Sequence, residues 1–157
     1  MGWLVVQQSV DGQIITPESP AVETQLTIVG SAISESSGLA ISGRDANCLW
    51  THNDSGGSAT IYAIDTTDSR VSGTWSLDGI RAIDWEAMTT IHSQGEEPNS
   101  ILIADVGDNR KQRDHVELIR FREPDPRSSG VIDARMIKRI KITYQDGPAD
   151  CEAVWYD

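Results

Sequence analysis

The stretch DWEAM at residues 84–88 decides the fold, because it occurs three times along the chain. It returns as DCEAV at residues 150–154, and a weaker copy, ESSGL, precedes it at residues 35–39. In each copy an acidic residue is followed by a short apolar run of strand type. The separations between copies lie near or somewhat above the roughly 40–50 residues of a propeller blade. The three acidic residues are therefore predicted to hold equivalent positions in a repeated structural unit.

Short apolar runs separated by Gly-, Asp- and Ser-rich turns predict two units of four strands each. The first unit, residues 35–78, has strands at 38–42, 48–53, 60–65 and 71–77. The second unit, residues 84–146, has strands at 87–92, 100–105, 115–122 and 136–144, with a long loop at 123–133. A third unit begins at residue 150, and its first strand is cut short at residue 157.

The repeated four-strand unit predicts an all-β fold, and more narrowly a partial β-propeller: two blades and flanking strands of a six- or seven-bladed ring. No segment has apolar residues at sustained helical spacing, so little helix is expected. Residues 1–24 are predicted to be irregular and residues 25–157 to form the propeller domain. Within that domain, the apolar run at residues 26–29 is a candidate strand for completing the last blade of a ring.

The charge composition argues against nucleic acid as a partner. The chain has 157 residues and a formal net charge of −11, which argues against nucleic-acid binding and favours cations. Ten of the 13 Lys and Arg residues lie between residues 110 and 141, where they are expected to form a solvated face.

No stretch resembles a signal peptide or approaches a membrane span. The two cysteines, Cys48 and Cys151, have no metal-site spacing and are expected to be unpaired.

Carboxylates at the repeated positions predict a metal site. If the units are blades, these side chains converge near the innermost strands, where mutual repulsion favours a bound hard cation, calcium or another divalent ion. The alternative is that each carboxylate accepts backbone hydrogen bonds at a turn or strand start. The predicted ligands are Glu35, Asp84, Glu86, Asp150 and Glu152 at the repeated positions, and Asp105 and Asp108 at the end of the second strand of the second unit.

A second recurring element is the polar turn that closes the second strand of each unit, after residues 53 and 105. His52, Asn53 and Asp54 of the first turn, together with Trp85, are predicted to contact a small ligand. Turn formation also explains much of this composition, because Asn, Asp and Gly tolerate positive φ. Glu86 is the candidate catalytic residue, since a carboxylate near a metal can activate water.

Five ordered stretches resemble a bacterial, mostly uncharacterised family of β-propeller proteins that is loosely similar to phytase-like and lactonase-like propellers. They are ESSGLA at 35–40, LWTHNDSG at 49–56, DWE at 84–86, GDN at 107–109 and DCEA at 150–153. The resemblance covers about residues 25–157. It implies a six- or seven-bladed ring with acidic residues near its channel and an exported protein, and it implies little about activity.

Three functions follow as hypotheses. The first is a fragment of an acidic, calcium-binding propeller that binds a small ligand or substrate at the channel end. The second is a metal-dependent hydrolase of phosphoesters or lactones, and the third is a protein-interaction scaffold. Because two blades leave sheet edges and faces uncovered, self-association of the chain is a further expectation.

Overall fold

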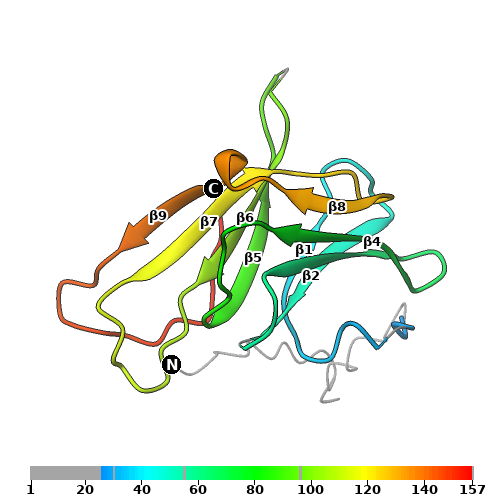
Figure 1. Ribbon diagram of the computed structural model, residues 1–157. Helices are drawn as coiled ribbons and strands as arrows, with labels where there is room; N and C mark the ends of the chain where they lie inside the picture. The colour runs from blue at the N-terminus through cyan, green and yellow to red at the C-terminus, as the bar shows by residue number, and fades with distance from the viewer. Residues whose placement is uncertain (1–25, 30, 55, 96, 157) are drawn as a thin grey trace, which may run out of the picture.

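The computed structural model describes residues 26–29, 31–54, 56–95 and 97–156, which fold into two β-sheets (Figure 1). One 3-10 turn, η1 (Ala134–Met136), is the only helical element of these residues, and it is too short to cross a membrane. The strands are β1 (Ser36–Ile41), β2 (Cys48–Asn53), β3 (Thr60–Asp65), β4 (Arg70–Leu77), β5 (Trp85–Ile91), β6 (Ser100–Asp105), β7 (Val116–Arg122), β8 (Ser129–Ile132) and β9 (Lys138–Ile142).

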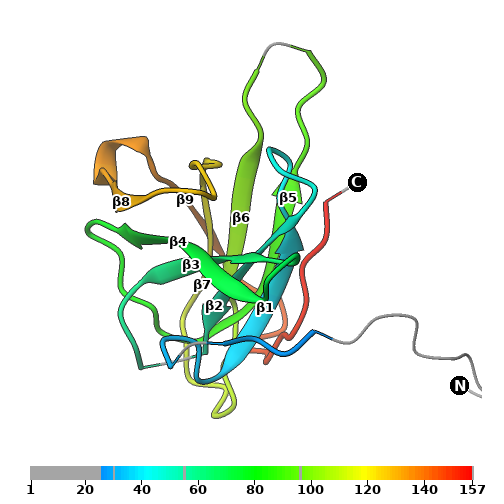
Figure 2. The ribbon, with the colours of Figure 1, turned by 90° about the vertical axis from the view of Figure 1, so that its right-hand side faces the viewer.

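Each predicted four-strand unit forms one sheet with its strands in chain order. The first sheet has the order β1-β2-β3-β4-β8, and its first four strands are antiparallel neighbours. The second sheet, β5-β6-β7-β9, is antiparallel throughout. Strand β1 lies beside β5 (Figure 2), so the first strands of the two units are adjacent and their starting ends are close together.

The main core lies between the two sheets. Residues alternate along each strand between the two faces of its sheet, and most of the inward positions are apolar. Trp50 and Ile61 of the first sheet meet Trp85, Met88 and others of the second in one buried cluster. Fully burying a side chain of this size stabilises the fold by about 1.5–3 kcal/mol. The facing apolar rows therefore hold the two sheets in a fixed arrangement.

The two units also repeat in detail. In both sheets the register between the first and second strands shifts by one residue, at Ser37 in the first and Glu86 in the second, as in a β-bulge. The side chain that ends the second strand also has the same role in both units. Asn53 accepts hydrogen bonds from the two backbone N–H groups of Ser34 and Glu35 (3.0 and 3.3 Å). In the second unit, the Asp105 carboxylate accepts hydrogen bonds from the backbone N–H groups of Ile83 and Asp84 (both 3.2 Å).

The structure corrects the prediction for the segment between β7 and β9. The predicted loop at residues 123–133 contains β8, which pairs in parallel with β4 of the other sheet. The predicted strand at 136–144 begins only at Lys138, because residues 134–136 form η1, capped by the Asp133 side chain. This segment therefore links the two sheets, with its first strand in one and its last in the other.

Both ends of the described chain also differ from prediction. In residues 26–29 only Val29 makes a β-bridge, with Arg70 at the start of β4, so this run follows the outer part of the first sheet. The third unit contains no strand within residues 150–156, although Val154 and Cys151 pack against the second sheet. The predicted irregular segment 1–24 lies outside the described residues.

Candidate metal centre

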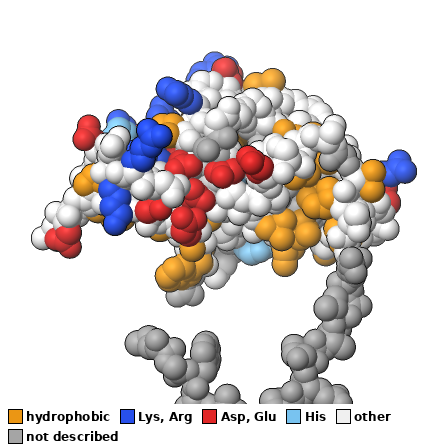
Figure 3. Space-filling view, turned by 90° about the horizontal axis from the view of Figure 1, so that it is seen from below, with side chains coloured by type: hydrophobic (Ala, Val, Ile, Leu, Met, Phe, Trp, Pro, Cys, Tyr) orange, Lys and Arg blue, Asp and Glu red, His pale blue; other side chains and the backbone are white. Residues whose placement is uncertain are grey.

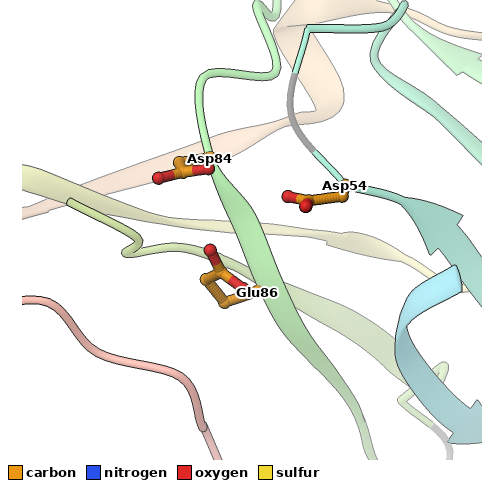
Figure 4. Close-up of side chains that lie close together, drawn as sticks. All are labelled: Asp54, Asp84 and Glu86. Atoms are coloured by element: carbon orange, nitrogen blue, oxygen red, sulfur yellow. The ribbon is translucent and has the colours of Figure 1, made fainter. Parts of the chain in front are cut away.

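Three carboxylates converge where the two sheets meet. Asp54, Asp84 and Glu86 each offer an oxygen atom, and these atoms lie within 4.8 Å of one another (Figure 4). All three side chains are half-buried. From below the molecule, acidic side chains form a band between hydrophobic side chains on one side and Lys and Arg on the other (Figure 3). Three hard oxygen donors within this distance fit the partial coordination shell of calcium, which takes six to eight oxygens and accepts water among them.

The ends of two neighbouring strands place these carboxylates. Asp54 directly follows β2, and its backbone N–H donates to the Glu35 carbonyl oxygen (2.9 Å). Asp84 directly precedes β5, and its backbone N–H donates to the Asp105 carboxylate (3.2 Å). Glu86 is the extra residue at the register shift of β5, and such bulges redirect side chains. Because β1 and β5 are adjacent, the end of β2 comes close to the start of β5.

Gly107 gives the carboxylates room. Its backbone N–H donates to the Asp84 carbonyl oxygen (3.2 Å), which fixes the loop after β6 against the start of β5. A Cβ atom at this position would lie 2.5 Å from Asp84 Oδ2 and closer still to Glu86 Oε1. Real Cβ contacts are longer than this, so a side chain at residue 107 would displace the carboxylates.

Burial and mutual repulsion disfavour the ionised forms of two of these acids. Burial, and after it the charge of Asp54, raises the pKa of Asp84. Burial, followed by the charges of Glu152, Asp54 and Asp84, raises the pKa of Glu86 to about 7. Glu152 therefore lies near the site as a fourth carboxylate, supplied by the C-terminal segment. A bound divalent cation would relieve this repulsion and favour the ionised forms.

Three of the predicted metal ligands instead support loops and turns. Asp105 forms an ion pair with Arg113 (2.7 Å) in addition to holding the start of β5. Asp108 accepts backbone hydrogen bonds from Gln112 (2.9 Å) and Arg113 (2.8 Å), which fold the loop between β6 and β7. Asp150 accepts the backbone N–H of Asp108 (2.7 Å) and so attaches the C-terminal segment to the same loop. Asp105, Asp108 and Asp150 therefore do not belong to the cluster of Asp54, Asp84 and Glu86, and they stabilise the segments around it.

The remaining predicted site residues lie around the cluster. Glu35 is exposed and contributes its carbonyl oxygen to the fixing of Asp54. Asn53 holds the entry to β1 through its side chain. His52 and Trp85 are buried and meet edge to face, with ring centroids 5.3 Å apart. Burial lowers the pKa of His52, which favours its neutral form. These two rings belong to the core between the sheets, behind the carboxylates.

No family model, no curated protein and no solved structure matches the chain. The class that the structure defines is an all-β protein of two repeated sheets, with a carboxylate cluster between the end of β2 and the start of β5. Its site consists of Asp84 and Glu86, which flank Trp85 at the start of β5, and of Asp54, which follows β2.

Proposed function

We propose that this chain is part of a β-propeller that binds a divalent cation, calcium in the first instance, between Asp54, Asp84 and Glu86. The observation that carries the proposal is the meeting of three carboxylate oxygens from two different sheets within 4.8 Å. Carboxylates from separate units, brought together at the cost of mutual repulsion, fit a site whose charge a hard cation balances.

The arrangement of the sheets supports the propeller assignment. Each sheet has four antiparallel strands in chain order, and the two sheets lie with their first strands adjacent, as successive blades do around a central channel. The acidic cluster would then lie at one end of that channel, where a cation with open coordination positions binds a small ligand or substrate through its oxygen atoms.

Calorimetric titration with calcium chloride tests the cation site. We expect the wild-type chain, freed of metal by chelation, to bind one calcium ion per chain. Asp84→Asn removes one charged ligand and should weaken binding by at least tenfold, while the matched change Asp78→Asn, at an exposed acid outside the cluster, should leave binding unchanged. Absence of calcium binding by the wild-type chain, with magnesium and manganese equally inactive, would refute the site.

A second candidate function is metal-dependent hydrolysis of a phosphoester or lactone. The observation that favours it is the fourth carboxylate, Glu152, beside Glu86. With Asp54 and Asp84 holding the ion, one of the two glutamates would be free to activate a water molecule. Turnover of a phosphoester or lactone panel that is lost in Glu86→Gln, with calcium binding retained, would support hydrolysis. A panel without any turnover would leave the protein a binding domain.

A further inference from the structure

The outer face of the first sheet, on the side away from the second sheet, is uncharged. Strand pairing aligns its residues in two rows: Leu39, Thr51, Tyr62 and Thr74, then Ile41, Leu49, Ile64 and Val71. The opposite rows contain the core residues Trp50 and Ile61, so these two rows point away from the core. Leu39 and Ile41 on β1 are 58% and 63% exposed, whereas Thr51 and Ile64 in the middle of the face are fully buried, so the open part of this face is at β1. None of the eight residues in these two rows is charged, which is unusual because the chain has 13 basic and 24 acidic residues.

The three copies of the repeated stretch indicate which kind of surface Leu39 would contact. Leu39, Met88 and Val154 occupy the same position in the three copies of the repeated stretch, the fifth. Met88 is buried in the core between the sheets, where it faces the first sheet. Val154 packs in the same way against the second sheet, beside Ala104 and Val116. In two copies, therefore, the fifth residue packs against the preceding sheet, and Leu39 is the one copy left exposed.

The surface that fits Leu39 is present in the chain itself. It is the outer face of the second sheet, where pairing aligns Ala87, Ala104 and Leu118 in one row. At present the segment at residues 150–156 covers part of that face through Val154 and Cys151. This segment forms no strand pairing, and Asp150 attaches it to the loop after β6 by accepting the Asp108 backbone N–H (2.7 Å). It covers the face without being part of the sheet.

We propose that β1, through its exposed Leu39 and Ile41, docks onto the outer face of the second sheet of another copy of this chain, where it takes the place of residues 150–156. The contact joins two different surfaces, so it repeats from copy to copy and builds a ring or an open chain of molecules. It is separate from the proposed cation site, because Leu39 and its row lie on the face of the first sheet opposite the core.

Sedimentation velocity of the full chain over a wide range of concentrations tests this docking. We expect the average mass to rise with concentration, and Leu39→Asp to keep the chain monomeric while it still binds calcium. The matched control is Met136→Asp, at a residue of η1 that is 63% exposed and belongs to neither sheet, which should associate as the wild type does. Val154→Asp should loosen the covering segment and strengthen association.

Cross-linking tests the orientation of the contact. In a Cys151→Ser background, Leu39→Cys and Ala87→Cys chains are mixed and oxidised, and we expect disulfides between residue 39 of one copy and residue 87 of another. Disulfides mainly between two copies of Leu39→Cys would overturn the head-to-tail arrangement. Monomeric wild-type and Val154→Asp chains at every concentration, or a Met136→Asp chain as monomeric as Leu39→Asp, would overturn the docking surface itself.

Discussion

Replacing Gly107 by alanine tests how closely the loop after β6 shapes the metal centre. The added methyl group would lie 2.5 Å from Asp84 Oδ2 and closer to Glu86 Oε1, so both carboxylates must shift by roughly an ångström to reach normal contact distances. Metal sites hold their ligands to about 0.2 Å, and disturbing the groups that orient ligands weakens metal binding roughly 10–100-fold. We therefore expect Gly107→Ala to lose about 1.4–2.7 kcal/mol of calcium affinity.

Calorimetric calcium titration, combined with thermal unfolding in a chelator, measures this effect. The matched control is Gly57→Ala, because a methyl group at Gly57 meets nothing within 4 Å. Gly57→Ala should bind calcium as the wild type does, and both variants should remain folded without metal. A Gly107→Ala chain with wild-type calcium affinity would show that the carboxylates around Gly107 do not form the binding site.

Three further predictions concern charge and burial. Burial and the neighbouring acids raise the pKa of Glu86 from 4.5 to about 7, so without metal the folded state loses stability as the pH rises through this interval. After allowance for solvent screening, Glu86→Gln should stabilise the metal-free chain by about 1–2 kcal/mol at pH 8 and hardly at pH 5, measured by urea unfolding. Hydrogen bonds from Thr67 and Arg127 lower the pKa of Asp65 to about 2, which contributes stability that is lost as the pH falls towards 2. Arg127→Gln should therefore destabilise the chain at pH 7, and its difference from wild type should shrink in acid unfolding series. Glu123, 1% exposed, accepts the Trp50 indole N–H (2.9 Å), and Glu123→Ala should cost about 2–4 kcal/mol in urea unfolding because it leaves buried donors without acceptors.

The sequence predicts the sheets well where turns and apolar runs alternate. The strands predicted at 48–53, 60–65 and 100–105 have the same bounds as β2, β3 and β6, because Asx- and Gly-rich turns limit each run on both sides. The sequence does not predict strand β8, since the segment at residues 123–133, with two Pro, two Ser and two Asp, is dominated by turn-forming residues. Its pairing partner is β4, more than 50 residues earlier in the chain, and that contact is set by tertiary packing.

The candidate site was predicted in part. The repeated stretch identified Asp84 and Glu86, but Asp54 was assigned to a ligand-binding turn because nothing in the sequence shows that the end of β2 meets the start of β5. Asp105 and Asp108 agree with the alternative hypothesis, in which the carboxylates accept backbone hydrogen bonds and do not bind a metal. Whether an acid at a turn supports the backbone or faces a ligand depends on the local register, as the shift at Glu86 illustrates.

The most direct test of the central claim is anomalous diffraction from crystals of the full chain soaked in manganese chloride. A cation site between the two sheets predicts a strong anomalous peak within bonding distance of Asp54, Asp84 and Glu86, which disappears in crystals of Asp84→Asn. Crystals without a peak at this position, or with a peak that persists in Asp84→Asn, would contradict it.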